Sequence, residues 1–194
     1  MAATQLKTEE TWTEEKIMAL TRDEVIELWK QAPAVEMAEL CGEYKGLIPN
    51  AGNEEAQKAT AKVMYNEDSA TGYWLGKAFS PLSHTKGDGY NRYRLPDGTI
   101  HRFMRFATEM ADSLIDGNRS LIMHYGAYQL QPPLIPEGVE NKLMDEIRKL
   151  ADGFYLGVGT VPLPDGKRSE PGHFVLVGPV GKWVGVDDYQ EELR

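Results

Sequence analysis

The side chains best suited to chemistry gather in residues 87–129, where His101 stands near Arg105 and His124 precedes Tyr125. A histidine titrates near neutral pH, so it can give a proton to a substrate or take one from it. An arginine nearby could hold a carboxylate or stabilise an oxyanion, and a tyrosine could hydrogen-bond an enol or phenol oxygen. We therefore interpret these four residues as candidate catalytic groups for acid/base chemistry that needs no cofactor.

Aromatic and cationic side chains that could contact a ligand lie on the predicted strands. The candidates are Tyr44, Trp74, Tyr90, Arg92, Phe103 and Tyr128. Strict alternation along a strand places Trp74 opposite Lys77, and Phe103 opposite Phe106, on the two faces of the sheet. The strands predicted in residues 87–129 carry polar side chains on both faces. A solvated outer wall would explain this pattern, and so would a cavity that contains several polar groups.

The elements that must position these side chains are predominantly strands. Two Asp-Gly steps, at Asp97-Gly98 and Asp116-Gly117, suit hairpin turns and divide residues 87–129 into three strands. Further strands are predicted in residues 42–52, 72–82, 154–163 and 172–181, which gives about seven or eight strands in all. Glycines inside strands, such as Gly76, indicate bends. We therefore expect an α+β fold built on an antiparallel β-barrel or a strongly curved sheet, with helices at the N-terminus.

Helical patterns fill most of the remaining chain. Thr21 and Glu24 form a Thr-x-x-Glu capping box ahead of an apolar stripe, and Asn53 is placed to cap a helix in residues 53–67. Short helices are predicted in residues 35–42 and, as a helical or mixed segment, in residues 141–153. We expect one domain over residues 1–194, with a helical segment at 1–41, the barrel at 42–186 and a polar tail at 187–194.

Composition narrows the classes of partner. A formal net charge of −9 argues against nucleic acid, whose binding needs clustered Lys and Arg. The four histidines lie in separate segments and only one cysteine is present, so we expect neither a metal site nor a cofactor. The N-terminus lacks the apolar core of a signal peptide, and apolar runs fall short of the roughly 18 residues that a membrane span needs. We therefore expect a cytoplasmic protein without a membrane span, and self-association is left open.

Four polar side chains receive structural interpretations. Cys41 follows apolar residues and is predicted to be a buried thiol, since cysteine often packs as a small hydrophobe. His84 and His173 fall in predicted rim loops and are expected to be solvated. Arg148, in the segment Asp-Glu-Ile-Arg-Lys, is expected to pair with Asp145 rather than to reach inward.

Three segments carry a resemblance to a known family. They are Gly42–Gly46 (GEYKG), Asp116–Tyr128 (DGNRSLIMHYGAY) and Met144–Gly159 (MDEIRKLADGFYLGVG). Together they resemble a pattern in small bacterial proteins of calycin-like, or lipocalin-like, barrel type. Tyr44 stands where the Gly-x-Trp-x-Gly start of such barrels has tryptophan, and His124 stands where these proteins have an aspartate. The resemblance implies a barrel with a central cavity for a hydrophobic or aromatic ligand.

Two functions follow as hypotheses. In the first, the barrel binds a hydrophobic, aromatic or lipid-like small molecule and acts on it as a lyase, isomerase or cyclase. In the second, it is a non-catalytic carrier or sensor of such a ligand. A barrel filled by its own side chains would instead be an interaction module. Titratable groups that converge in the cavity would favour catalysis, and a purely apolar lining would favour transport.

Overall fold

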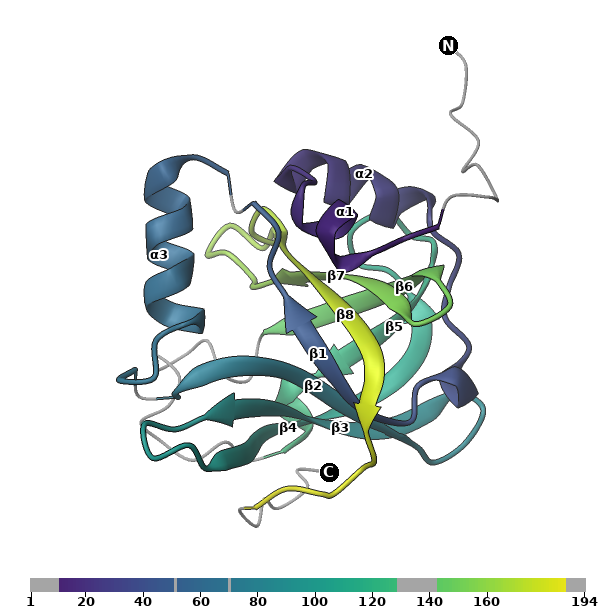
Figure 1. Cartoon of the computed structure of the whole chain (residues 1–194). Helices are drawn as coiled ribbons and strands as arrows, with labels where there is room; N and C mark the ends of the chain where they lie inside the picture. Colours follow the sequence, from purple (N-terminus) through teal and green to yellow (C-terminus); the bar gives the residue numbers. More distant parts are fainter. Residues whose placement is uncertain (1–10, 51, 70, 129–142, 188–194) are drawn as a thin grey trace.

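The computed structural model describes residues 11–50, 52–69, 71–128 and 143–187, and its centre is a closed antiparallel barrel. Eight strands among these residues follow one another in chain order, and β8 pairs with β1 to close the barrel (Figure 1). Their bounds are β1 (Gly42–Leu47), β2 (Tyr73–Pro81), β3 (Lys86–Arg94), β4 (Ile100–Asp112), β5 (Arg119–His124), β6 (Met144–Ala151), β7 (Phe154–Thr160) and β8 (Gly172–Gly181). The predicted α+β barrel is confirmed.

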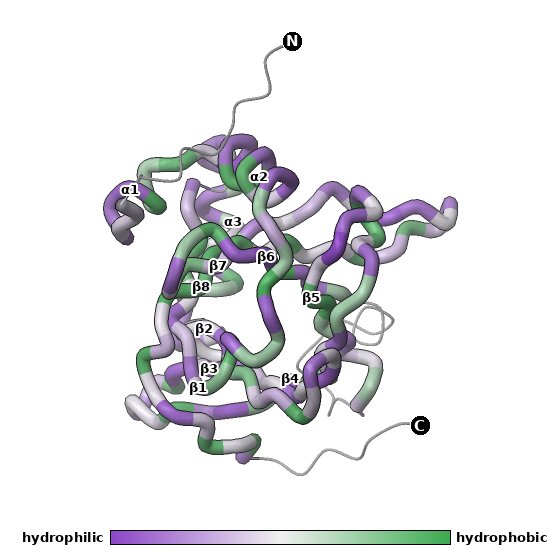
Figure 2. The backbone as a smooth tube through the Cα atoms, turned by 90° about the vertical axis from the view of Figure 1, so that its right-hand side faces the viewer, coloured by the Kyte–Doolittle hydropathy of each residue, from purple (hydrophilic) through white to green (hydrophobic). Residues whose placement is uncertain are grey.

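Helices cover the wall and both ends of the barrel. They are α1 (Glu14–Met18), α2 (Arg22–Gln31), the short 3₁₀ helix η1 (Met37–Glu39) and α3 (Glu54–Met64), and a second 3₁₀ helix, η2 (Tyr125–Ala127), follows β5. Helix α2 packs on β6, β7 and β8, and the predicted capping box at its start is present, with both reciprocal hydrogen bonds. Figure 1 shows α3 and η1 at opposite ends of the barrel, and Figure 2 looks along the ring of strands from the η1 end.

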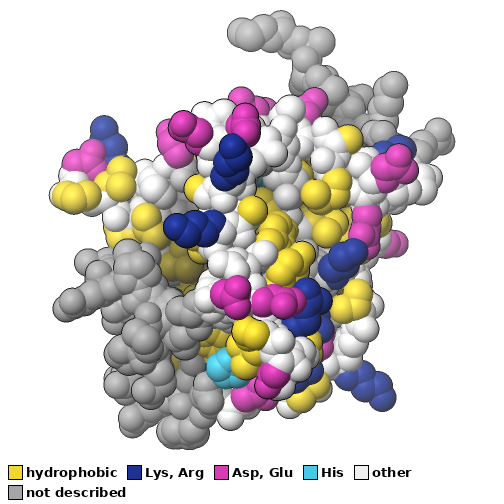
Figure 3. Space-filling model, turned by 60° about the vertical axis from the view of Figure 1, so that its left-hand side comes forward, with side chains coloured by type: hydrophobic (Ala, Val, Ile, Leu, Met, Phe, Trp, Pro, Cys, Tyr) yellow, Lys and Arg dark blue, Asp and Glu magenta, His cyan; other side chains and the backbone are white. Residues whose placement is uncertain are grey.

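The two ends of the barrel differ in how they are closed. At the η1 end, Met37 and Leu40 belong to the same buried core as Tyr44 and Phe79, so side chains fill the interior there. At the other end α3 has no fully buried residue, and its Val63 is 61% exposed. Figure 3 brings the α3 end forward and shows hydrophobic side chains among charged ones on that face. Among the described residues, the cavity at the centre of the barrel opens toward α3.

Two β-bulges overturn the expected alternation of faces. On β2 the register shifts between Trp74 and Gly76, where Gly76 adopts φ 129°, and both Trp74 and Lys77 then face the interior. On β4 the register shifts opposite Gly89 and Asn91, with Met104 at φ 53°. A bulge adds one residue to a strand and so reverses the faces beyond it. Predictions that Trp74 opposes Lys77 and that Phe103 opposes Phe106 were wrong for this reason: both phenylalanines are buried in the interior cluster.

Two short segments differ from the predicted helices. Residues 144–151 form strand β6 rather than a helical segment. Asp145 and Ile147 face the interior, whereas Arg148 contacts α2 and Glu146 accepts a hydrogen bond from the Leu114 amide in the β4–β5 connection. Residues 141 and 142 lie outside the described part of the chain, as does the proline-rich connection 131–138. The helix predicted in residues 35–42 is reduced to η1, since the chain must turn at Gly42, with φ 109°, to enter β1.

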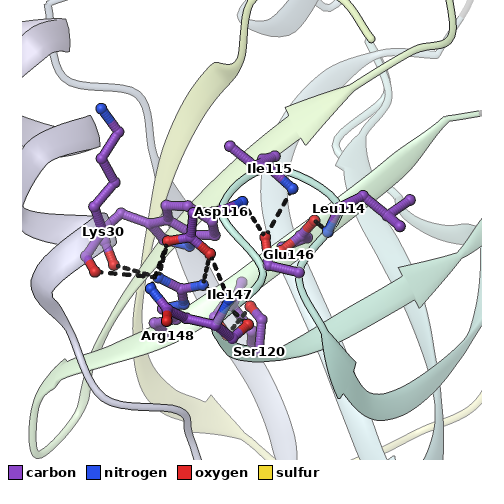
Figure 4. Close-up of polar contacts among 11 residues, drawn as sticks. Lys30, Leu114, Ile115, Asp116, Ser120, Glu146, Ile147 and Arg148 are labelled. Carbon is purple, nitrogen blue, oxygen red and sulfur yellow. Dashed lines mark hydrogen bonds and ion pairs between the residues drawn. The ribbon is translucent and has the colours of Figure 1, made fainter. Parts of the chain in front are cut away.

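Arg148 joins the N-terminal helices to the barrel. Its side chain is fully buried, and its guanidinium donates to both carboxylate oxygens of Asp116 at 2.6 and 2.8 Å. It also donates to the backbone carbonyls of Trp29 and Lys30, both at 3.3 Å, and lies 3.9 Å from the Trp29 ring (Figure 4). The prediction that Arg148 pairs with Asp145 was wrong, because the two side chains leave opposite faces of β6.

Cys41 is exposed, so the prediction of a buried thiol was also wrong. It stands between Leu40, which is buried in the core, and the turn at Gly42. Neighbouring residues in an extended segment point in opposite directions, so burial of Leu40 sends the Cys41 side chain outward.

Candidate functional site

The barrel holds a cavity of about 450 Å³ that reaches from its centre to α3. Its inner part is lined by side chains of five strands and of the 3₁₀ helix η2 (Tyr125–Ala127): Trp74, Lys77, Asn91, Tyr93, Met104, Tyr125, Asp145 and Phe174. Its mouth is lined by residues of α3 and of the adjoining loops, among them Ile48, Val63, Met64 and His173. The cavity is therefore a mainly apolar chamber with a small set of polar groups at its inner end, as in sites that bind one small molecule.

The polar groups at the inner end form one hydrogen-bonded cluster, which we call the lysine cluster: Lys77, Asn91, Tyr125 and Asp145. Lys77 Nζ lies 2.8 Å from Asp145 Oδ2, 2.5 Å from the Tyr125 hydroxyl and 2.9 Å from Asn91 Oδ1. The Tyr125 hydroxyl donates to Asp145 Oδ2 at 2.9 Å and accepts from Asn91 Nδ2 at 3.1 Å. Strands β2, β3 and β6 and the 3₁₀ helix η2 thus bring an ammonium, a carboxylate, a phenol and an amide into mutual contact.

Burial shifts the pKa values of two side chains in this cluster. Desolvation lowers the pKa of Lys77, and the nearby Asp145 carboxylate opposes that shift. Desolvation also raises the pKa of Tyr125 well above its usual value, so this residue stays a neutral phenol. The rings of Trp74, Phe106, Tyr125 and Phe174 lie 5.1–5.9 Å from Lys77 Nζ. The side chains of Lys77 and Asp145 are only 5% and 9% exposed, so the cluster is a buried group of titratable side chains.

Two of the predicted site residues, Trp74 and Tyr125, line the cavity. Trp74 Nε1 donates to Asn91 Oδ1 at 3.2 Å, which ties the indole to the lysine cluster. Phe103 is buried behind Tyr93, with ring centroids 4.9 Å apart. Tyr44 is buried toward the η1 end, where its hydroxyl donates to the Glu39 carbonyl at 3.2 Å. These two rings support the core and are absent from the cavity lining described here.

Tyr90 and Arg92 lie on the outer wall of the barrel instead of the cavity. Both contact the buried carboxylate of Glu43, the Tyr90 hydroxyl at 2.9 Å and Arg92 Nε at 3.0 Å. The chain after β8 covers this contact, because the Trp183 ring packs on Tyr90 at 4.6 Å. Tyr90 and Arg92 alternate with Asn91 along β3, so the inward position of Asn91 directs them outward.

The remaining candidates also lie away from the cavity. His124 Nε2 lies 2.7 Å from Glu109 Oε1, across the β4–β5 pair. Arg105 forms a bidentate ion pair with Asp88, and its guanidinium lies 4.0 Å from the Tyr128 ring. His101 is half-buried and stacks on Phe103 at 4.4 Å. The bulge at Met104 reverses the alternation of side chains along β4, so His101 and Arg105 no longer share a face, and neither lines the cavity.

Three members of the lysine cluster were not selected from the sequence. Lys77 is the one charged residue of an otherwise apolar strand segment, Tyr73–Pro81, and a lone charge in such a segment can signal a buried functional group. The alternation of side chains along β3 places Asn91 on the same face as Tyr93, and this pattern is visible in the sequence. Asp145 carried no such signal, because its segment was assigned to a helical or mixed element.

His84 is exposed in the β2–β3 connection, as expected. His173 lies at the cavity mouth on β8 and is buried, so its predicted position in a solvated loop was wrong. The ring Nε2 of His173 lies 3.1 Å from the Pro49 carbonyl. Desolvation lowers the pKa of His173 below 6.5, and the nearby Arg22 acts in the same direction.

This shift predicts a pH dependence of stability. As pH falls below about 6.5, His173 binds a proton in the unfolded chain before it does so in the folded chain, so the free energy of unfolding falls. We expect the free energy of unfolding, measured by urea denaturation, to fall less between pH 7.5 and pH 5.5 in His173→Gln than in the wild type. Equal losses in the two proteins would contradict this assignment. Glutamine can keep a hydrogen bond to Pro49 but does not titrate.

Other site types find little support in the described residues. Within residues 11–50, 52–69, 71–128 and 143–187, no three His, Cys, Asp or Glu side chains gather in a way that could hold a metal ion. The helices described there are all too short or too polar to cross a membrane.

Comparison with known proteins adds a likeness of fold. No protein-family model matches the chain, and no curated protein matches it in sequence. A crystal structure of a protein from Thermomonospora curvata is similar to the barrel, with a TM-score of 0.53 and 19% sequence identity. The match covers 84% of this chain and 94% of that one. It establishes a shared fold and nothing more.

Proposed function

We propose that the barrel binds a hydrophobic, aromatic or lipid-like small molecule and acts on it by cofactor-independent acid/base chemistry of lyase, isomerase or cyclase type. The observation that carries this proposal is the lysine cluster at the inner end of an apolar cavity. Burying a charged pair costs free energy that a simple carrier has no need to spend. Perturbed titratable groups in a cavity are typical of catalytic sites.

The cluster suggests a division of roles. Asp145 is the candidate base, because its carboxylate borders the cavity and is held by Lys77 and Tyr125. Lys77 holds this carboxylate in place through their ion pair and would stabilise negative charge that develops on a bound substrate. Tyr125, a neutral phenol, orients the carboxylate through its donated hydrogen bond. These roles replace the earlier ones of His101, His124 and Arg105, which lie elsewhere, and keep Tyr125.

A carrier or sensor of the same ligand is the second candidate. The specific observation in its favour is that the three protons of the Lys77 ammonium each have an acceptor in the cluster. An ammonium whose protons are all accepted can be a structural group that holds β2, β3, β6 and η2 together around the cavity. The resemblance of Gly42–Gly46 to the start of calycin-type barrels also supports ligand binding as the shared element of both candidates.

The test begins with ligand binding and ends with turnover. Native mass spectrometry of the purified protein, followed by a thermal-shift screen of phenols, aromatic acids, sterols and fatty acids, identifies the ligand class, because binding raises the melting temperature. The ligand is then incubated with the wild type and with Asp145→Asn. We expect product from the wild type, and a loss of at least about 100-fold in turnover, with binding retained, in the variant.

The outcomes separate the candidates. A ligand recovered unchanged from the wild type would contradict catalysis and favour the carrier. Turnover that survives in a folded Asp145→Asn protein would exclude Asp145 as the base. Failure of every compound class to bind would contradict both candidates.

A further inference from the structure

One carboxylate oxygen of the lysine cluster has no hydrogen-bond donor among the described residues. Asp145 Oδ2 accepts from Lys77 and Tyr125, whereas Oδ1 makes no hydrogen bond in this part of the chain. The Asp145 side chain is only 9% exposed. Oδ1 is not among the fully buried side-chain atoms that lack a partner, so it is accessible from the cavity that Asp145 lines, and a ligand there can supply the donor.

The wall beside this oxygen is kept open by glycine. Gly159 lies opposite Asp145 in the β6–β7 pair, and a Cβ atom placed on it would stand 2.5 Å from Asp145 Oδ1. Gly159 and its neighbour across β7–β8, Gly172, both line the cavity. Any side chain at residue 159 would therefore occupy the space that a ligand group needs to reach Oδ1.

The charges around this oxygen restrict the donor. Lys77 Nζ lies 2.8 Å from the other oxygen of the same carboxylate, so the pair is neutral as a whole. Because the pair is neutral, a cationic or anionic ligand group would gain little net attraction from it to offset the cost of leaving water. An uncharged hydroxyl can donate a hydrogen bond to Oδ1 without that cost.

We propose that the ligand is an uncharged phenol or alcohol whose hydroxyl donates to Asp145 Oδ1 in the space over Gly159. Trp74, Tyr93 and Phe174 surround the adjoining cavity and favour an aromatic or similarly broad apolar body. This assignment rests on the proposed function, since it names the ligand class of the same cavity. It places the hydroxyl proton on the oxygen that would remove it in acid/base chemistry.

The ligand-side experiment uses four naphthalene probes of similar size, titrated into the full-length protein by calorimetry or tryptophan fluorescence. They are naphthalene, 2-naphthol, 2-methoxynaphthalene and 2-naphthoate. A hydrogen bond to a buried carboxylate is worth about tenfold to 100-fold in affinity. We expect 2-naphthol to bind tighter than naphthalene by that factor. We expect no gain for 2-methoxynaphthalene, which keeps the oxygen but cannot donate, and weaker binding for 2-naphthoate.

The protein-side experiment uses a matched pair of glycine variants. In Gly159→Ala the added methyl group blocks Oδ1, and we expect the preference for 2-naphthol over naphthalene to disappear. In Gly172→Ala the nearest heavy atom to the added methyl group is 3.8 Å away, so we expect the preference to remain. If Gly159→Ala does not fold, the probe series on the wild type decides alone.

Several results would overturn the assignment. They are equal affinities for 2-naphthol and naphthalene, tighter binding of 2-naphthoate, and a preference for 2-naphthol that persists in folded Gly159→Ala. In each of these cases the cavity still binds an aromatic body, so the proposed binding function would survive. Absence of binding by all four probes would instead contradict the cavity as a ligand site.

Discussion

Replacement of Arg148 by alanine is expected to lower the free energy of unfolding by about 3–5 kcal/mol, because it leaves the Asp116 carboxylate without its buried partner. The variant also loses the hydrogen bonds to the carbonyls of Trp29 and Lys30 and the contact with the Trp29 ring. The loss therefore falls on the junction between α2 and the barrel. Urea denaturation measures it, and hydrogen exchange should show that residues 22–31 lose protection first.

Arg119 provides a matched control. Its side chain is 51% exposed and lies 3.8 Å from Asp112, and exposed ion pairs contribute at most about 1 kcal/mol. The free energy of unfolding of Arg119→Ala should therefore lie within about 0.5 kcal/mol of the wild-type value. Equal stabilities for Arg148→Ala and Arg119→Ala would show that Arg148 does not anchor the helices.

The second large effect is expected at Lys77. Lys77→Met removes the partner of a buried carboxylate and should cost about 3–5 kcal/mol, again from an uncompensated charge. The double variant Lys77→Met/Asp145→Leu removes both charges and should be clearly more stable than Lys77→Met alone, which a double-mutant cycle by urea denaturation measures. Lys149→Met, at ion pairs with Glu39 and Asp152 on the barrel surface, is the control and should change stability by less than about 1 kcal/mol.

Additive losses in the double variant would contradict a coupled Lys77–Asp145 pair. A folded double variant also separates stability from function. It should keep the barrel, as judged by circular dichroism, yet lose the turnover that the wild type shows on its ligand. Turnover that persists without both charges would remove the lysine cluster from the mechanism.

Local signals in the sequence were sufficient for most of the barrel. The Asp-Gly steps at residues 97–98 and 116–117 lie in the β3–β4 and β4–β5 connections as predicted, and Thr21 and Glu24 cap α2. Turn and cap chemistry depends on a few neighbouring residues, so it can be recognised without knowledge of the fold. Strand β6 was missed because its apolar and polar positions also fit a short helix.

The candidate site was harder to predict because it depends on non-local geometry. Bulges at Gly76 and Met104 change which side chains face inward, and the positive φ of Met104 has no residue-type signal. The partners of His124 and Arg105, namely Glu109 and Asp88, come from neighbouring strands whose register the sequence does not specify. Trp74 and Tyr125 were selected from the sequence and line the cavity, while Lys77 and Asp145 were recognised only once β2, β3, β6 and η2 had been placed together.

A crystal structure of the protein with the tightest ligand from the screen tests most directly whether the cavity is the functional site. We predict the ligand inside the barrel, its apolar body against Trp74 and Phe174 and its polar group within hydrogen-bond distance of Asp145. A ligand bound on the outer wall, or a cavity that holds only water while the ligand binds in solution, would contradict this prediction. In that case the lysine cluster is a structural feature of the core and the functional site lies elsewhere.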